Sequence, residues 1–286
     1  MNKKTFIAFI SPSLFIMVIL MVIPLFAAMY LGLNVITYSN LNEPVFVGFQ
    51  NYREVLTDPD FWKSLQFTLI YILATVPVQI FLGFIVAICL DQVRRLRGLY
   101  IGILLLPMII TPVVATLLFR SLFDKGGIIY YVLREFFNYN FVFKTSTVKF
   151  LIFINAVWSA VSFTMIVLFS GLQTLNKSTL EAATVDGATF FQKIRYVVLP
   201  HLSSLFVFLG LMNVMDSYKA FDNILVLSKQ NPLFRVDTIM YYNFKMATIF
   251  GRLGKANAMS ILTVIGIFVV LIPYLIITYK QQTESK

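Results

Sequence analysis

Phe150–Asn176 reads FLIFINAVWSAVSFTMIVLFSGLQTLN and contains no Asp, Glu, Lys or Arg. A helix crosses the hydrocarbon core of a bilayer in about 20 residues, so this stretch is long enough to span a membrane. Five more stretches are as long and as free of charge: Thr5–Asn42, Ser64–Leu90, Gly98–Phe119, Tyr196–Met215 and Ala256–Tyr279. The pattern predicts an all-α integral membrane protein, one domain over residues 1–286, with six transmembrane helices at about 10–33, 65–90, 99–120, 149–172, 201–223 and 256–279.

The composition supports this fold class and excludes several functions. Of the 286 residues, 59% are hydrophobic and only 13% are charged. The excess of 23 Lys and Arg over 13 Asp and Glu lies at the ends of the apolar runs, which is typical of headgroup anchors and not of a nucleic-acid interface. One cysteine, Cys89, and one histidine, His201, provide neither a disulfide framework nor a metal cluster. We therefore expect no metal site and no catalytic site.

The charged segments predict the orientation of the chain. Those on the side of the termini are short and basic, as in Asp91–Arg97, whereas the opposite loops are longer and include Glu43, Asp58 and Asp237. Basic residues collect on the cytoplasmic side, so both termini are expected in the cytoplasm. The first apolar run is longer than the 7–15 residues of a signal-peptide core and is expected to remain as a membrane anchor.

Prolines interrupt three of the predicted spans. Pro12 and Pro24 lie in the first, Pro77 in the second, and Pro107 and Pro112 in the third. Proline removes a helix hydrogen bond and clashes with the preceding turn. We expect kinks in these helices, covered by neighbouring helices.

The largest cytoplasmic segment is predicted to be the loop Ser178–Pro200, STLEAATVDGATFFQKIRYVVLP. Ser178 with Glu181, and Thr189 with Gln192, have the spacing of a capping box, in which a hydroxyl and a later side chain cap each other's backbone amides. Gly187 between them suits the left-handed position at a helix end. The loop is therefore predicted to form two short helices joined by a tight turn.

The same loop resembles a known signature. Glu181-Ala182-Ala183, then Gly187, then Val197-x-Leu199-Pro200 are similar to the EAA motif of permeases in binding-protein-dependent ABC importers, with Val197 where that family usually has Ile. In that family the loop forms a coupling helix that sits in a cleft of the ATPase subunit. The resemblance implies an ATPase-coupling role for Glu181, Ala182, Ala183, Asp186, Gly187, Leu199 and Pro200.

The resemblance extends roughly from Ser11 to Tyr279 and points to the carbohydrate branch of these permeases. Phe46–Tyr52 and Asp58–Trp62 resemble the extracytoplasmic segment after the first helix, and Phe221–Ser228 resembles the end of the fifth core helix. That family often continues into a Gly-Gly-Pro turn, whereas this chain has Gln230-Asn231-Pro232. The geometry of this turn is therefore left open.

The resemblance implies that the chain is one subunit of a transport complex in the bacterial plasma membrane. We expect a type I permease-like bundle that pairs with a second permease subunit, as a homodimer or a heterodimer. Two ATPase subunits that use ATP and Mg²⁺ are expected below the pair, and an extracytoplasmic solute-binding protein is expected to deliver the solute. The chain has no G-x-x-x-x-G-K-[ST] phosphate loop, and Gly251–Lys255 has the wrong spacing for one. Neither a bound cofactor nor an enzymatic activity is expected in this chain. The rival class is an intramembrane protease or metal enzyme, but the chain has one histidine and therefore no H-E-x-x-H or other two-histidine site.

The expected solute is a sugar or oligosaccharide, and the alternatives are glycerol phosphate, a polyamine or an amino acid. A phosphate would be expected to meet several cationic groups, and Lys219 is the one such residue in the interior of the predicted spans, since Arg120 and Lys149 lie at span ends.

Two sets of polar residues in the fourth and fifth spans are candidates for the substrate path. Asn155, Ser159 and Ser162 share one helix face, as do Asn213, Asp216 and Ser217, and polar residues inside a bilayer usually face a wet cavity. The alternative is that they only hold helices together. With the neighbouring aromatic residues, the predicted path is Asn155, Trp158, Ser159, Ser162, Asn213, Asp216, Ser217 and Tyr218. Asp216 is expected to pair with Lys219, and Asp222 to shape the helix end without touching the solute.

Overall fold

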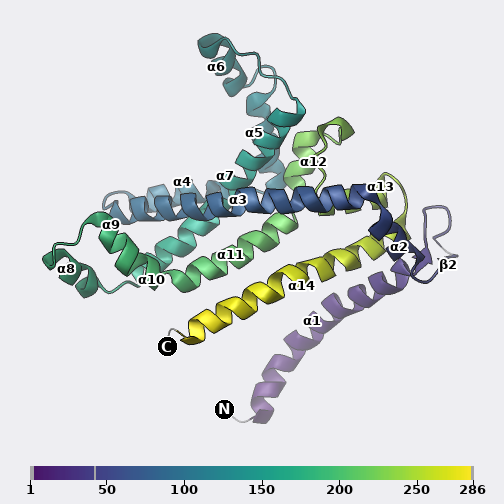
Figure 1. The fold of residues 1–286 in the computed structure, drawn as a ribbon, viewed down its shortest axis with the longest axis horizontal. Helices are drawn as coiled ribbons and strands as arrows, with labels where there is room; N and C mark the ends of the chain where they lie inside the picture. Colours follow the sequence, from purple (N-terminus) through teal and green to yellow (C-terminus); the bar gives the residue numbers. More distant parts are fainter. Residues whose placement is uncertain (1–2, 42, 285–286) are drawn as a thin grey trace. The chain divides into compact units, whose positions relative to one another are not determined.

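The computed structural model describes residues 3–41 and 43–284, which are helical apart from one short hairpin and the connecting loops. These residues divide into two compact units. One unit holds the described residues up to Leu65 together with Ile239–Val270, and the other holds Gln66–Thr238 and the residues from Leu271 onward. Figure 1 follows the chain through both.

Four helices of the described residues are long and apolar enough to cross a membrane, and they number six if two bent pairs each count as one span. The bent pairs are built around α4 with α5 and around α10 with α11. The four unbroken helices are α1 (Lys3–Gly32), α3 (Pro59–Gln92), α7 (Thr145–Gln173) and α14 (Leu253–Glu284). They correspond to the predicted first, second, fourth and sixth spans.

The predicted third span is not one helix but two. α4 (Arg97–Ile109) and α5 (Pro112–Phe123) meet at a bend of 99°. Pro112 is the first residue of α5, and Thr111 before it is extended, with ψ 138°, because a residue that precedes proline avoids the helical region. α4 continues unbroken through Pro107, where a kink is predicted, and the predicted span 99–120 corresponds to the bent pair α4 and α5.

The predicted fifth span, 201–223, is also interrupted. α10 (Leu199–His201) and α11 (Ser203–Tyr218) belong to helices that meet at 69° beside Leu202. The chain leaves helical conformation again after Tyr218, and a separate helix, α12 (Asp222–Ser228), follows. The apolar run therefore contains two changes of direction that hydropathy alone does not predict.

In the first unit, α1 exposes apolar side chains on every face, with Phe9 79% and Leu20 67% exposed. A helix that is apolar all round is stable where lipid or protein surrounds it.

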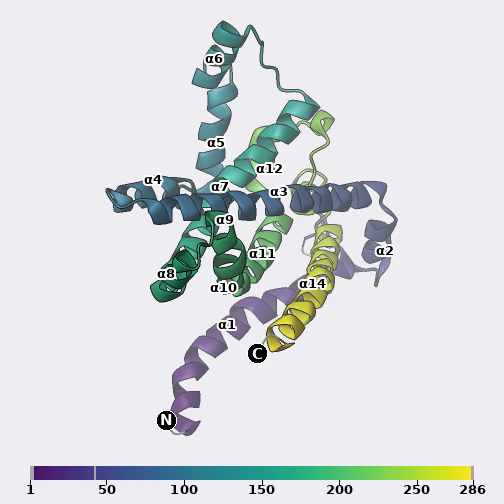
Figure 2. The ribbon, with the colours of Figure 1, turned by 60° about the vertical axis from the view of Figure 1, so that its left-hand side comes forward.

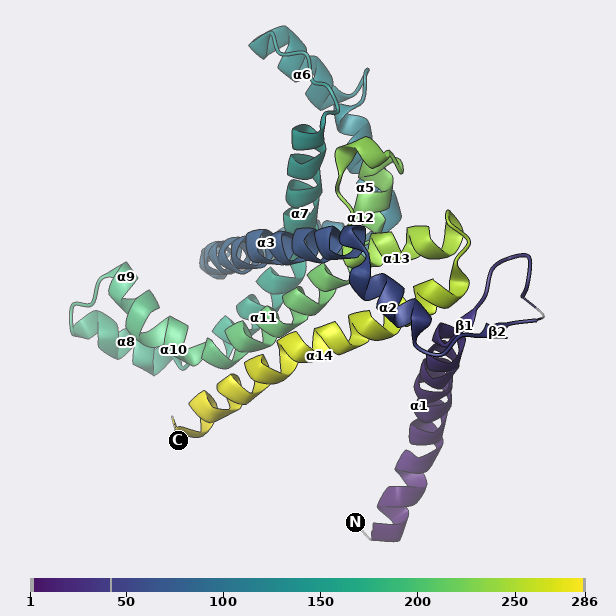
Figure 3. The same ribbon diagram turned by 45° about the vertical axis from the view of Figure 1, so that its right-hand side comes forward.

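A hydrogen-bonded cap follows α1 in the first unit. It comprises β1 (Asn34–Val35), β2 (Val45–Phe46) and α2 (Gln50–Thr57), and Figure 3 shows the hairpin just beyond the end of α1, with α2 nearby. The Nδ2 of buried Asn51 donates to the carbonyls of Gly32 and Asn34, at 2.9 Å each. A Cβ on Gly254 would lie 2.0 Å from the Asn34 carbonyl oxygen, so only glycine allows this approach.

A buried ion pair holds the same unit together. Lys255 Nζ, in the first turns of α14, lies 3.2 Å from the Asp58 carboxylate, and these side chains are 9% and 17% exposed. The hydroxyl of Tyr242, on α13 (Ile239–Thr248), donates to the same carboxylate at 2.8 Å. Three segments distant in sequence thus meet at one carboxylate.

The second unit is built on α7. A Cβ on Gly83 of α3 would lie 2.5 Å from the Thr164 side chain, so α3 and α7 are in close contact there. The Ser162 hydroxyl donates to the Leu104 carbonyl of α4 at 2.7 Å. Buried Leu168, Leu202 and Leu209 lie in the apolar core on this side of the unit.

Short helices occupy separate ends of the second unit. α8 (Lys177–Val185) and α9 (Phe190–Lys193) lie together, away from α6 (Ile128–Phe137), as Figures 1 and 2 show. Between α9 and α10 the chain forms a π-helix, η1 (Ile194–Val198), in which the Leu199 amide donates to the Ile194 carbonyl five residues back.

The structure shows the geometry of the turn at Gln230-Asn231-Pro232, which the sequence left open. Lys229 and Gln230 have φ values of 49° and 58°, a left-handed conformation that glycine adopts at little cost. A 3₁₀ turn, η2 (Pro232–Phe234), follows. The chain thus keeps a glycine-type turn without glycine.

We predict that Lys255→Met destabilises the first unit. Removing one partner of a fully buried ion pair costs about 3–5 kcal/mol, and less here because Asp58 is partly exposed. Thermal unfolding of the detergent-solubilised protein, followed by tryptophan fluorescence, measures the loss. Lys63→Met is the matched control, since the pair of Lys63 with Asp60 is 74% and 65% exposed and such pairs contribute about 1 kcal/mol or less. Equal melting temperatures for the two variants would contradict the assignment.

The same pair predicts a pH dependence. Burial alone raises the pKa of Asp58, but hydrogen bonds from Tyr242 and Lys255, among others, leave its pKa below the ordinary value. The resulting stabilisation is fully present above the unfolded pKa of about 3.9 and is lost as pH falls through the lower folded pKa. Below about pH 4, we expect Asp58→Asn to lose less stability per pH unit than the wild type, as measured by the melting temperature.

We also predict that Gln230→Gly stabilises the protein slightly, by up to about 1 kcal/mol, because it removes the cost of a left-handed non-glycine residue. Arg134→Gly, in the middle of exposed α6, should instead cost about 1 kcal/mol. If both glycines lower the melting temperature alike, the turn does not have this geometry.

Candidate functional site

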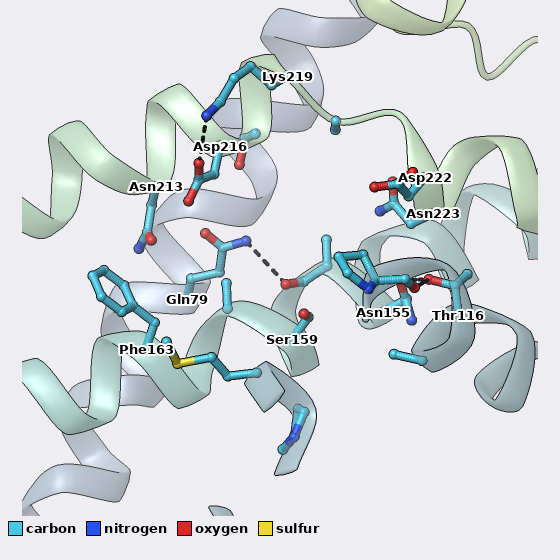
Figure 4. Close-up of a pocket in the computed structure, with 18 of the residues that line it drawn as sticks. Gln79, Thr116, Asn155, Ser159, Phe163, Asn213, Asp216, Lys219, Asp222 and Asn223 are labelled. Atoms are coloured by element: carbon cyan, nitrogen blue, oxygen red, sulfur yellow. Dashed lines mark hydrogen bonds and ion pairs between the residues drawn. The ribbon is translucent and has the colours of Figure 1, made fainter. Parts of the chain in front are cut away.

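A polar cavity of about 600 Å³ lies within the second unit. Its wall comes from α3, α4, α5, α7, α11 and the start of α12. Two of the helix interruptions, α4–α5 and α11–α12, border it. Ile110 and Pro112 lie at the first interruption, and Lys219, Ala220 and Phe221 at the second. Figure 4 shows polar side chains from several helices directed toward this space.

Amides and hydroxyls supply the polar part of a wall whose surface is mostly apolar. Asn213 Nδ2 donates to Thr164 Oγ1 at 3.2 Å, which joins α11 to α7. Asn155 Oδ1 accepts from Thr116 Oγ1 of α5 at 3.3 Å. The Ser217 hydroxyl lies 3.4 Å from that of Thr75. These contacts position the polar groups at helix contacts and fix the helices that surround the cavity.

The far side of the wall is attached through α12. Asn223 Nδ2 donates to the hydroxyl of Tyr71 at 3.1 Å. The charged groups of the wall are Asp216, Lys219 and Asp222, and the expected ion pair of Asp216 with Lys219 is present at 3.1 Å. Asp222 lines the cavity as well as opening α12, so its position differs from the one expected from the sequence.

Arg120 fixes the outer part of this wall. It is 7% exposed, and its guanidinium donates to the carbonyls of Val226 and Leu227 near the end of α12. It also stacks over Phe143, 4.3 Å from the ring centre. The last carbonyls of a helix have no partner within it, so Arg120 satisfies them and joins α12 to α5.

Five of the eight residues predicted for the substrate path line this cavity: Asn155, Ser159, Asn213, Asp216 and Ser217. The other three lie outside its wall. Trp158 is 39% exposed and stacks on Phe119, with ring centres 6.1 Å apart. Ser162 is bonded to α4, and Tyr218 is buried at 3% exposure. A role in solute passage remains a prediction for the five.

Sequence reasoning missed wall residues on other helices, among them Gln79 of α3 and Thr116 of α5. Both are polar residues inside predicted spans, which is a signal the sequence does contain. Their grouping with Asn155 depends on how α3 and α5 pack against α7. Helix-face periodicity, counted one span at a time, does not supply that information.

The loop Ser178–Pro200 forms the predicted pair of short helices. Thr189 and Gln192 make the predicted capping box, with a 2.7 Å bond from the Thr189 amide to Gln192 Oε1. The other box was wrong. Asn176 caps α8 by accepting from the Ser178 amide at 3.0 Å, because the helix begins earlier and places Ser178 inside its first turn.

The turn between these helices has the geometry that glycine was expected to provide. Gly187 has a φ of 75°, the amide of Ala188 donates to the Ala183 carbonyl, and that of Gly187 donates to the Thr184 carbonyl. Together these two bonds form the Schellman arrangement. Lys193 Nζ donates to Thr184 Oγ1 at 2.9 Å and ties the second helix to the first.

The surface of this loop is apolar and uncovered in the chain. Val185 is 88% exposed, Phe191 78% and Tyr196 74%. Beside them lies a hollow of about 290 Å³, whose wall includes Ala183, Asp186 and Gly187. Exposed apolar patches of this kind mark protein-interaction sites.

Two proteins whose names state what they transport resemble the chain over most of its length. It is 26% identical to the trehalose/maltose transport system permease protein MalF of Thermococcus litoralis. The matched region covers 93% of this chain and 90% of MalF. It is 27% identical to the sn-glycerol-3-phosphate transport system permease protein UgpA of Agrobacterium fabrum, over 77% of this chain and 76% of UgpA.

A solved structure shares the fold. The crystal structure of a bacterial ABC transporter involved in the import of the acidic polysaccharide alginate superposes with a TM-score of 0.82 at 17% identity, covering 97% of this chain and 96% of that one. Residues 59–282 match the family described as binding-protein-dependent transport system inner membrane component. The chain belongs to this family of inner-membrane transport components, and the matched residues include the EAA-like loop.

Proposed function

We propose that this chain is one of two membrane-spanning subunits of an ATP-driven importer in the bacterial plasma membrane, which passes a sugar or oligosaccharide delivered by an extracytoplasmic binding protein. The observation that carries the proposal is the polar cavity between α7 and α11. These two helices are connected by the loop Ser178–Pro200, so one segment joins the cavity to a surface suited to a partner protein.

The polar wall suits a sugar. A sugar hydroxyl both donates and accepts hydrogen bonds, and Asn155, Ser159 and Asn213 offer both kinds of group. Phe163 adds a ring, against which the C–H face of a sugar can pack. The name of MalF, with trehalose and maltose as its solutes, supports the same solute class.

The partner at the loop is proposed to be an ATPase subunit. The uncovered side chains of Val185, Phe191 and Tyr196 provide an apolar contact surface, and the Glu181 carboxylate lies exposed on the same short helix pair. ATP and Mg²⁺ would be bound by the ATPases and not by this chain. Closure of two ATPases would move the loop, and α7 and α11 would transmit the movement to the cavity.

Termini in the cytoplasm follow from the short basic segments on their side of the membrane. A second permease subunit, identical or different, would complete the pathway. Changes in solute access require contacts that differ between the inward-open and outward-open states. The interrupted helices α4–α5 and α11–α12 border the cavity and are the elements best placed to provide them.

Changes at the loop should abolish ATP-dependent uptake and leave the protein inserted. Gly187→Trp places a bulky residue at a left-handed position, and Glu181→Lys reverses an exposed charge. Uptake of labelled maltose by proteoliposomes containing the complete transporter, and co-purification of the ATPase, are the measurements. Glu54→Lys, at a partly exposed acid on α2, is the matched control and should transport normally. Wild-type uptake in either loop variant would exclude the docking assignment.

Changes in the cavity should separate transport from assembly. Asn213→Leu and Asn155→Leu are expected to lower the uptake rate at least about tenfold, as the loss of a hydrogen bond in a solute path can, with normal recovery of the assembled transporter. Ser162→Leu is the contrasting variant, because Ser162 bonds α4 outside the cavity, and should lower assembly and transport together. If all three variants lower both alike, the polar residues serve only helix packing.

A further inference from the structure

The charges in the cavity wall are unbalanced. Lys219 is its only cationic side chain among the lining residues, and its ammonium lies 3.1 Å from the Asp216 carboxylate. Figure 4 shows this pair as a dashed line on the wall formed by α11. Lys219 therefore faces a carboxylate before a solute enters, and the three charges of the wall sum to one negative charge.

Asp222 supplies a second carboxylate with no counter-ion. It lies at the start of α12, half-buried, and makes neither a hydrogen bond nor an ion pair within the described part of the chain. Arg120, the nearest buried cation on α5, is engaged with the carbonyls at the other end of α12. The wall contributed by this chain thus has one unpaired negative charge.

Two buried side-chain amides in the wall each have one polar atom without a hydrogen-bond partner among the described residues. Gln79 and Asn155 are each 3% exposed and line the cavity. Gln79 Oε1 and Asn155 Nδ2 have no partner within the described residues, although buried polar groups nearly always have one. The terminal torsions of Asn and Gln are broad, so a small rotation turns either group into the cavity. One acceptor and one donor together match a hydroxyl group.

We propose that the cavity selects an uncharged polyhydroxylated solute, a neutral oligosaccharide, and discriminates against uronates and sugar phosphates. Asp222 and Gln79 accept hydrogen bonds from solute hydroxyls, and Asn155 donates one. An anionic solute meets the uncompensated charge of Asp222, and one like charge at short range lowers affinity about tenfold. The inference rests on the proposed function and separates this chain from relatives whose named solutes, glycerol phosphate and alginate, are anionic.

The test uses the complete transporter in lipid nanodiscs without its binding protein, so that the cavity alone selects. The probes are trigalacturonate, its neutral trimethyl ester and maltotriose, followed by saturation-transfer NMR. In the wild type, maltotriose and the ester should bind at least about tenfold more tightly than the acid. Asp222→Asn should reduce the preference for the ester over the acid about tenfold. Asp60→Asn, an exposed acid of the other unit, should leave the preference unchanged.

A second variant tests the amide. Gln79→Met keeps the length of the side chain and removes its acceptor, so both neutral probes should bind less tightly. Tighter binding of trigalacturonate than of its ester in the wild type, or a preference that Asp222→Asn does not alter, would overturn this inference and leave sugar import intact. A wild-type transporter that binds no saccharide and shows no ATP-dependent saccharide uptake would instead overturn the proposed function.

Discussion

Backbone amides and carbonyls in a bilayer need partners, and this constraint determines where the chain can interrupt its helices. Non-helical backbone at membrane depth is tolerated where protein covers it or where it borders a water-filled space. The interruption between α4 and α5 and the one between α11 and α12 both border the same cavity. Arg120 satisfies two carbonyls near the end of α12. At these two interruptions the irregular backbone borders the cavity, whereas the bend at Leu202 lies in the apolar core.

Much of the fold could be predicted because apolar runs and caps are local signals. Four spans appear as unbroken helices, and the capping box at Thr189 and the left-handed Gly187 are present. The break at Pro112 was underestimated as a kink, since proline fixes its own conformation but not whether neighbouring segments stay in line. At Ser178, Asn176 two residues earlier was the stronger cap, and two overlapping local signals could not be ranked from the sequence.

The cavity was predicted only in part, because it depends on packing between helices. Counting positions on a helix correctly grouped Asn155 with Ser159, and Asn213 with Asp216. The same count included Ser162, which turns to the Leu104 carbonyl of α4. It could not include Gln79, whose proximity to the others follows from the close contact of α3 with α7 at Gly83. Whether a helix face lines the cavity therefore depends on the helices that pack against it.

The π-helix within the loop Ser178–Pro200 gives chain length a direct geometric meaning. Each residue of an α-helix advances the side-chain direction by about 100°, and the single π turn at Ile194–Val198 accommodates an additional residue. The helical register of α9 therefore does not carry over into α10, and an insertion or deletion in this segment is equivalent to rotating α10 relative to α9. The number of residues in the loop thus sets the direction from which the chain reaches the bend at Leu202 that precedes α11.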